Sequence, residues 1–172
     1  MSEARTIARM VRKGRNTSDD TSTLDAYRMR GFECLCGNTR MAARALTALY
    51  DAHLGPSGLT SSQLAVLWCV MGAEPLAMGE IARHLVMDKT TVSRNVAALV
   101  EAGLVLVRPG EDGRVRTLAS TAKGRRAFAA AMPLWEEAQA EATRQLGEAR
   151  FSDAVLRTRR LARALGGTPR RS

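Results

Sequence analysis

The chain has 172 residues, and 45% of them are apolar, so it can bury a hydrophobic core and is too apolar to be disordered throughout. Its 26 lysines and arginines outnumber its 17 acidic residues, and the net charge of +9 favours a polyanionic partner over an acidic protein surface. The longest apolar run, Leu64 to Met71, is too short to cross a bilayer, and the N-terminus lacks the apolar core of a secretory signal. We therefore expect a cytoplasmic protein with reduced cysteines.

The first predicted elements are an N-terminal arm and a helix. Residues 1–30 combine an arginine-rich start with a polar and acidic run, which predicts a flexible arm. From about Glu33 to His53, apolar residues recur at near-helical spacing and predict a first helix. The run "GPSG", from Gly55 to Gly58, ends that helix.

Three shorter helices are predicted next. Thr60 and Gln63 form a possible capping box in front of the second helix, and "GAEP" ends it. A third short helix follows, and Asp88 offers a side-chain cap for the fourth. Two short helices around a tight turn form a helix-turn-helix, whose second helix can enter the major groove of DNA.

The fourth helix, which contains "DKTTVSRNV", has two different sides. Val92, Val96 and Leu99 keep helical spacing and predict a buried face. Short hydroxyls and long cations occupy the other side, where a polyanion could approach closely: Lys89, Thr90, Thr91, Ser93 and Arg94. An ordinary solvated, capped helix is the alternative interpretation of this stretch.

The remaining sequence predicts a wing and two further helices. After Gly103, "LVLVRP" is typical of a strand, "GEDG" of a turn and "RVRTLA" of the returning strand. Thr121 offers a cap to a long helix, and a last helix is expected near Ser152 to Leu165. The first and the last two helices carry more apolar surface than a winged module covers, so we expect a homodimer. The alternative is that these helices pack only on their own domain.

Together these elements predict a mainly α fold with a small β-wing, in which a winged helix-turn-helix lobe joins a helical dimerisation lobe. The expected divisions are an arm at 1–30, a first dimerisation helix at 31–57, a DNA-binding domain at 58–120, C-terminal dimerisation helices at 121–166 and a tail at 167–172.

Three stretches resemble the MarR family of winged-helix transcription regulators: "GLTSSQLAVLWCV", "EIARHLVMDKTTVSRNVAALVEAGLVLVRPGEDGRV" and "TAKGRRAF". The resemblance covers roughly residues 32–166. It implies that residues 88–98 form the recognition helix, with the five polar residues named above nearest the DNA, and that Arg94 can fork onto a guanine.

The resemblance also assigns roles in the wing. It implies that Arg114 reaches into the minor groove and that Asp112 steadies the loop. Gly113 replaces an arginine that is usual in the family, and we expect Arg108 and Arg116 to compensate. Ala77 and Ser120 also depart from the family pattern, at positions usually held by a hydroxyl cap and by leucine.

The stretch "FECLCGNTRMAARALTALYD" resembles the opening of the family's organic-hydroperoxide and oxidant sensors. This resemblance places Cys36 on their reactive cysteine and Tyr50 on a tyrosine that holds the thiolate, whereas Arg40 replaces a second tyrosine.

The residues themselves give a separate reason for interest. A helix N-terminus, with Arg40 and Arg44 following Cys36, favours a thiolate, which peroxides oxidise to sulfenic acid. Residues two apart on a helix point about 200° away from each other, so a disulfide between Cys34 and Cys36 would have to unwind that turn. The alternative is that both cysteines are small apolar fillers.

Other sites in this sequence are less well supported. Cys69 lies in an apolar stretch, and we expect it to be buried and inert. Neither His53 nor His84 has a familiar metal-ligand spacing to the cysteine pair, so no metal or other cofactor is predicted.

We therefore predict a dimeric transcription regulator, a repressor of a palindromic operator in double-stranded DNA, released by thiol oxidation at Cys34 and Cys36. The main alternative is release by a small aromatic or lipophilic ligand. Trp68 and Met71 could line its crevice, although both are more typical of core residues. A nonspecific DNA-coating protein and a thiol peroxidase based on Cys36 are rivals from other classes. No enzyme motif was found in the sequence.

Overall fold

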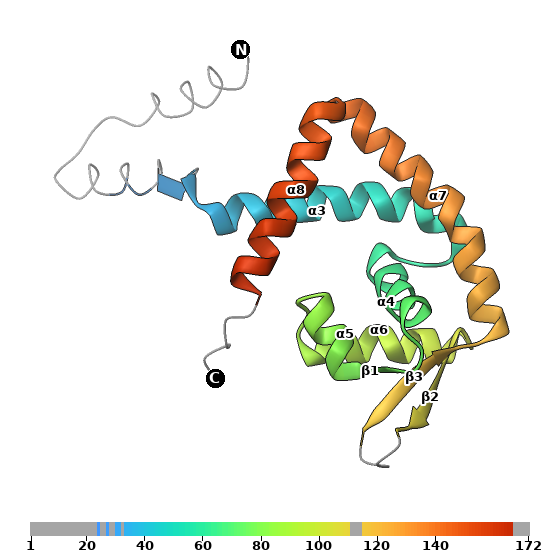
Figure 1. Ribbon diagram of the computed structural model, residues 1–172. Coiled ribbons are helices and arrows are strands. Elements are labelled where there is room, and N and C mark those ends of the chain that lie inside the picture. Colours follow the sequence, from blue (N-terminus) through green and yellow to red (C-terminus); the bar gives the residue numbers. More distant parts are fainter. Residues whose placement is uncertain (1–23, 25–26, 28–29, 32, 111–114, 167–172) are drawn as a thin grey trace. The chain divides into compact units, whose positions relative to one another are not determined.

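The computed structural model describes residue 24, residue 27, residues 30–31, 33–110 and 115–166 (Figure 1). The chain divides into two compact units, Met1–Leu46 and Thr47–Ser172, and the division falls inside helix α3 (Leu35–Leu54). Most of the predicted arm and the whole of the predicted tail, 167–172, lie outside the described residues.

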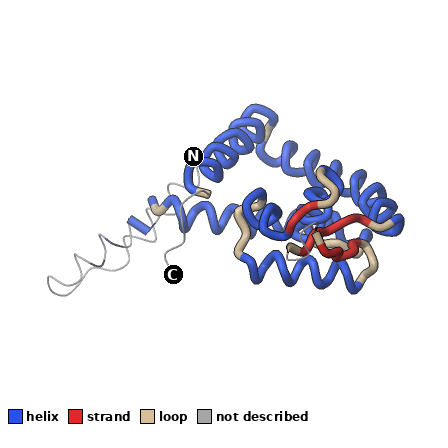
Figure 2. The backbone as a smooth tube through the Cα atoms, turned by 60° about the horizontal axis from the view of Figure 1, so that its bottom comes forward, coloured by secondary structure: helices blue, strands red, loops and turns tan. Residues whose placement is uncertain are grey.

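The second unit contains the predicted succession of helices with a small sheet. After α3 come η1 (Gly55–Ser57), α4 (Ser61–Gly72), β1 (Leu76–Ala77), α5 (Met78–His84), α6 (Lys89–Glu101), β2 (Val105–Pro109), β3 (Arg116–Ser120), α7 (Ala122–Leu146) and α8 (Glu148–Leu165). Figure 2 shows the three short strands beside a predominantly helical chain. The fold class is confirmed as mainly α with a β-wing.

The helix starts follow the predicted capping residues. The Thr60 hydroxyl accepts the Gln63 backbone N–H at 3.2 Å, and the Gln63 side chain accepts the Thr60 N–H at 2.9 Å. This reciprocal pair satisfies two N–H groups that an α-helix leaves without partners. The two remaining predicted caps, on α6 and α7, also form.

The sheet is antiparallel with strand order β1-β3-β2. Leu118 at its centre pairs with Leu76 on one side and with Val107 on the other. Strand β1 was not predicted, because two residues are too few to show an alternating pattern. Leu76 is nevertheless buried, so β1 ties the end of α4 to the wing.

One hydrophobic core unites the second unit, and α4 lies at its centre. That helix buries Leu64, Val66, Leu67 and Val70 and packs against α6, α7 and β3. Helix α6 contributes the stripe predicted for it, Val92, Val96 and Leu99. Because the core holds one side of α6, its opposite side remains at the surface.

The two departures from the family pattern have local explanations. Ser120 is 8% exposed, and its hydroxyl accepts a hydrogen bond from Arg125 Nη1 at 2.9 Å. Its backbone N–H donates to Glu74 Oε1 at 3.1 Å. At the start of α5, Glu80 accepts the Ala77 N–H at 3.1 Å, which supplies half of a capping box without a hydroxyl.

Two helix starts differ from the predicted positions. The last helix begins at Glu148, one turn earlier than the expected Ser152. The first helix was expected to run on from Glu33, but Cys34 is not helical and α3 begins at Leu35.

Thr121 joins α7 to the end of α6. Its hydroxyl accepts the Gly124 N–H at 2.8 Å and donates to the Gly103 carbonyl, also at 2.8 Å. We expect Thr121→Ala to lower the free energy of unfolding by about 1–2 kcal/mol, because both bonds are lost. Thr121→Ser, which keeps the hydroxyl, should retain most of the stability. Urea denaturation measures both variants, and wild-type stability for the alanine variant would contradict this role.

Candidate DNA-binding surface and cysteine pair

The surface side of α6 carries the residues predicted to meet DNA. Lys89, Thr90, Ser93 and Arg94 are exposed, whereas Thr91 is half-buried. Within the described part of the chain, the side chains of the four exposed residues make no hydrogen bond or ion pair. Their donors are therefore available to a ligand, and an arginine of this kind can fork onto a base edge or a phosphate.

Thr91 also has a structural role at the start of α6. The Asp88 carboxylate accepts both the backbone N–H and the hydroxyl of Thr91, each at 2.8 Å. Asn95, which was not predicted as a site residue, donates to the Thr91 carbonyl at 2.9 Å and to the Ser62 hydroxyl at 3.4 Å. These contacts fix the first turn of α6 against α4.

The wing presents two arginines on adjacent strands. Arg108 pairs with Thr117, and Arg116 pairs with Pro109. The two arginines therefore occupy adjacent pairs of the hairpin. Because side chains alternate along a strand, Arg108 and Arg116 point to opposite faces of the hairpin. The Gly110 N–H donates to the Val115 carbonyl and closes the strand ends. The predicted tip residues Asp112, Gly113 and Arg114 lie outside the described residues.

The two candidate redox cysteines are both exposed in the first unit. Cys34 immediately precedes α3, and its Sγ accepts the Gly37 backbone N–H at 3.4 Å, as an N-cap side chain does. The Cys34 carbonyl accepts two bonds from Asn38, from the backbone N–H at 3.0 Å and from Nδ2 at 2.9 Å. Cys36 lies in the first turn of α3. The helix-capping sulfur is thus that of Cys34.

Tyr50 and Cys69 lie in the second unit. The Tyr50 hydroxyl donates to Gln139 Oε1 of α7 at 2.5 Å, and burial raises the pKa of this phenol. Burial likewise raises the pKa of the Cys69 thiol, which is half-buried on α4. Cys69 is thus less buried than predicted, and it has less thiolate than an exposed cysteine would. Its inertness stays a prediction.

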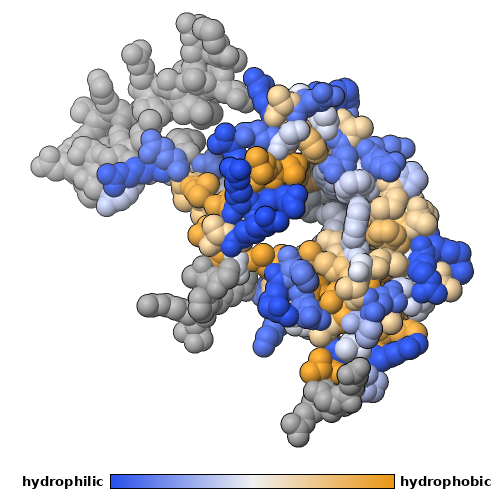
Figure 3. Space-filling view, viewed as in Figure 1, coloured by the Kyte–Doolittle hydropathy of each residue, from blue (hydrophilic) through white to orange (hydrophobic). Residues whose placement is uncertain are grey.

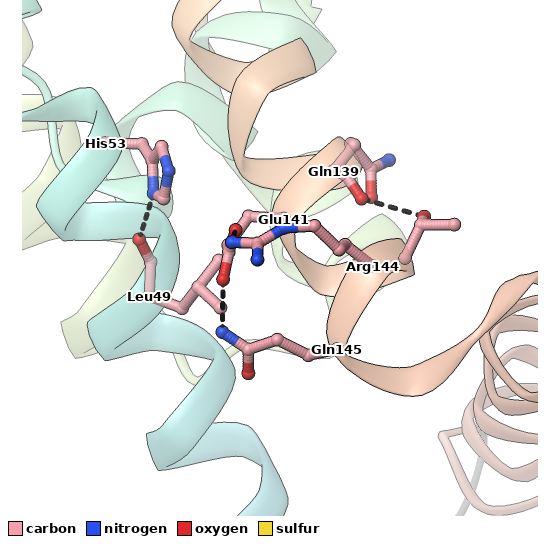
Figure 4. A network of polar contacts seen from close by, with 7 residues as sticks. Leu49, His53, Gln139, Glu141, Arg144 and Gln145 are labelled. Carbon is pink, nitrogen blue, oxygen red and sulfur yellow. Dashed lines mark hydrogen bonds and ion pairs between the residues drawn. The ribbon is translucent and has the colours of Figure 1, made fainter.

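The Tyr50 contact joins the second half of α3 to α7, and further polar contacts form within each of these two helices (Figure 4). His53 Nδ1 lies 2.9 Å from the Leu49 carbonyl. On α7, hydrogen bonds from Gln145 and Arg144 hold the pKa of the Glu141 carboxyl below its usual range. These exposed contacts orient side chains and add little stability.

A small cavity opens between α4 and its neighbours in the second unit. It has a volume of about 130 Å³ and is lined by Tyr50, Leu54, Ser61, Leu64, Ala65, Trp68 and Trp135. Trp68 makes edge-to-face contacts with Phe128 and Trp135, at centroid distances of 5.3 and 5.2 Å. Met71, for which a core position was preferred over a place in a ligand crevice, packs against the core.

Among the described residues, no group of three or more histidine, cysteine or acidic side chains could hold a metal ion. None of the helices described is both long and apolar enough to cross a membrane.

Comparison with known proteins agrees with this geometry. The sequence profile of the MarR family matches residues 57–115, which span α4, α5, α6 and β2 and end just before β3. The M. tuberculosis transcriptional regulator MosR is 37% identical, with a TM-score of 0.67 over 78% of this chain and 98% of the MosR chain. The chain belongs to the MarR family. In the winged-helix fold of this family, α6 is the second helix of the helix-turn-helix and the β2–β3 hairpin is the wing.

Two other known proteins are also similar to this MarR-family chain. A crystal structure of MosR in complex with DNA matches at 38% identity, with a TM-score of 0.64 over 77% of this chain and 99% of that one. The HTH-type transcriptional regulator YwoH of Bacillus subtilis is 33% identical over 87 residues, which are 51% of this chain. The match spans 64% of the length of YwoH.

Proposed function

We propose that the chain is a dimeric repressor that binds a palindromic operator through α6 and the wing, and that oxidation of Cys34 and Cys36 releases it. The exposed side of α6 is the main support for the proposed DNA binding. Lys89, Thr90, Ser93 and Arg94 are held there by a capped first turn and a buried apolar stripe. Arg108 and Arg116 on the wing, with Arg114 at its tip and Asp112 steadying the loop, add phosphate and minor-groove contacts.

Exposed apolar residues support the dimer. In the first unit, α3 exposes Leu35, Met41 and Leu46, and in the second unit α8 exposes Val155, Leu156 and Leu165. Apolar and hydrophilic residues are interspersed over the face shown in Figure 3. Helix α8 buries none of its residues within the chain, although it carries apolar positions at helical spacing. A second copy would cover these faces and space the two recognition helices along the duplex.

The two exposed cysteines support redox control. The resemblance places the reactive cysteine at Cys36, but we assign the first step to Cys34, because its Sγ already accepts an N–H at a helix start. Its thiolate attacks an organic hydroperoxide, so that an S–O bond forms, the O–O bond breaks and the leaving alkoxide takes a proton to become an alcohol. The Cys36 thiolate then attacks the sulfenic sulfur, an S–S bond forms, and hydroxide leaves as water after protonation. Two electrons pass from the dithiol to the peroxide.

We expect the disulfide to disturb the start of α3. Cys34 caps the helix from outside and Cys36 belongs to its first turn, so a bond between their sulfurs should draw the Cys34 sulfur from its capping contact and unwind that turn. Unwinding breaks the Gly37–Cys34 contact and the two bonds from Asn38. Since α3 also carries apolar surface proposed for the dimer, oxidation would disturb the spacing of the recognition helices. Tyr50 lies further along α3, and its hydrogen bond to Gln139 would pass a displacement of α3 on to α7.

Oxidation is expected to weaken operator binding by about tenfold or more, the size of a typical allosteric coupling. The test compares the reduced and cumene hydroperoxide-treated protein on DNA from upstream of its own gene. Cys34→Ser and Cys36→Ser should each lose the disulfide and most of the response, whereas Cys69→Ser, the matched control, should respond as wild type does. Unchanged wild-type affinity after complete oxidation would refute redox release.

A small aromatic or lipophilic effector is the second candidate, because Trp68 lines the cavity described above and is 42% exposed. The chain has two tryptophans, and both line this cavity. Ligand entry should therefore quench the intrinsic fluorescence and weaken DNA binding over the same concentration range. Quenching without any loss of DNA binding would count against an effector role.

A further inference from the structure

Val86 has a backbone conformation that disfavours its own side chain. It lies in the turn between α5 and α6 with φ of +52°, and it is the only non-glycine residue in the described part of the chain with a positive φ. A β-branched residue is rare in this left-handed region, because its side chain crowds the backbone. The turn therefore carries a conformational cost that glycine at the same position would avoid.

The hydrogen bonds explain why the turn needs this conformation. The Met87 N–H donates to the Ala82 carbonyl at 3.0 Å, and the Val86 N–H lies 3.4 Å from the Arg83 carbonyl. These two bonds form a Schellman motif, whose left-handed position is usually glycine. The helix-turn-helix thus ends α5 in an ordinary way, but with a valine where the motif favours the smallest residue.

Burial in the core does not account for the valine, since Val86 is 47% exposed. Its methyl groups instead meet the end of α8, because a Cβ built on Gly166 would lie 3.0 Å from Val86 Cγ2 and 3.4 Å from Cγ1. Gly166 is the residue that follows the last turn of α8. Two segments about 80 residues apart in sequence therefore touch at the turn of the helix-turn-helix.

The position of this contact connects α8 with the recognition helix. Asp88, the cap of α6, follows Val86 by two residues, and α6 begins at Lys89. A shift of the turn therefore moves the start of α6. We propose that Val86 is a positioning residue, which holds the helix-turn-helix against the end of α8 and so couples the placement of that helix to the orientation of α6. This inference rests on the proposed function, in which α8 belongs to the dimer interface and α6 reads DNA.

Full-length Val86→Ala and Val86→Gly are the first test. Both remove the methyl contact, but only glycine also removes the backbone cost. We expect both to bind the operator about fivefold or more weakly, while the thermal midpoint of the glycine variant stays at or above that of the alanine variant. A residue that merely tolerates strain would give a glycine variant with wild-type operator affinity, and that result would overturn the proposal.

A double-mutant cycle with Gly166→Ala tests the contact itself. The added methyl collides with Val86 in the wild-type background and finds those methyl groups absent in the Val86→Ala background. Its collision with the Ala162 carbonyl, which a Cβ would approach to 2.5 Å, is the same in both backgrounds and cancels. We expect the loss of operator affinity caused by Gly166→Ala to differ at least about threefold between the two backgrounds. Additive effects would overturn the proposal.

Measurements on the wild-type protein distinguish a failure of this inference from a failure of the proposed function. If wild type prefers no DNA site, the proposed function fails and this inference fails with it. If wild type binds one site preferentially and both Val86 variants match it, only the positioning role is refuted.

Discussion

Gly124→Ala is expected to lower the free energy of unfolding by about 3 kcal/mol or more, the range of severe overpacking. Gly124 lies in the first turn of α7, where an added Cβ would approach the Leu104 carbonyl oxygen to 2.0 Å and the carbonyl carbon to 2.9 Å. Those atoms are backbone between α6 and β2, and they cannot move aside as a flexible side chain could. Urea denaturation followed by circular dichroism measures the loss.

Gly79→Ala is the matched control for that experiment. Gly79 lies within α5, and a Cβ there would meet no other atom within 4 Å. Because alanine favours a helix over glycine, this variant should keep or gain stability, by up to about 1 kcal/mol. Equal stability of the two variants would contradict the close approach of Gly124 to the Leu104 carbonyl.

Arg94→Ala is expected to weaken binding to the operator by about 5- to 150-fold, which corresponds to the value of one bidentate contact with a base. Arg94 is exposed on α6, on the side opposite the buried Val92 and Val96, so its removal should leave the fold intact. The loss should concentrate on the operator, and affinity for scrambled DNA should fall much less. Fluorescence anisotropy at fixed salt measures both affinities.

Arg150→Ala removes the same charge from an exposed position on α8 and controls for net charge. It should leave the ratio of operator to scrambled affinity unchanged, because a charge far from the recognition helix carries no base information. An Arg94 variant that loses affinity equally for both DNAs would assign Arg94 to a phosphate contact instead of a base contact.

Local signals in the sequence predicted most of the fold. The Thr60–Gln63 box and the caps at Asp88 and Thr121 depend on residues at most three positions apart, so the pattern alone identifies them. Strand β1 escaped detection because its two residues are strand-like only through pairing with β3. Tertiary context, which a single sequence does not show, determines such a strand.

The candidate sites were predicted less completely. Helical spacing was sufficient to separate the exposed side of α6 from its buried stripe. The role of Thr91 as a partner of Asp88 depends on a rotamer, and the capping position of Cys34 depends on where α3 begins, so neither is evident from the sequence. Val86 gave no signal at all, because valine normally argues against a left-handed turn.

Hydroxyl-radical footprinting on DNA from upstream of the protein's own gene tests the central proposal, that two copies present paired α6 helices to an operator. We expect a protected palindrome whose half-sites lie about one helical turn apart, with two chains bound per duplex. Uniform protection without a preferred site, by a monomer whose affinity depends only on salt, would contradict it.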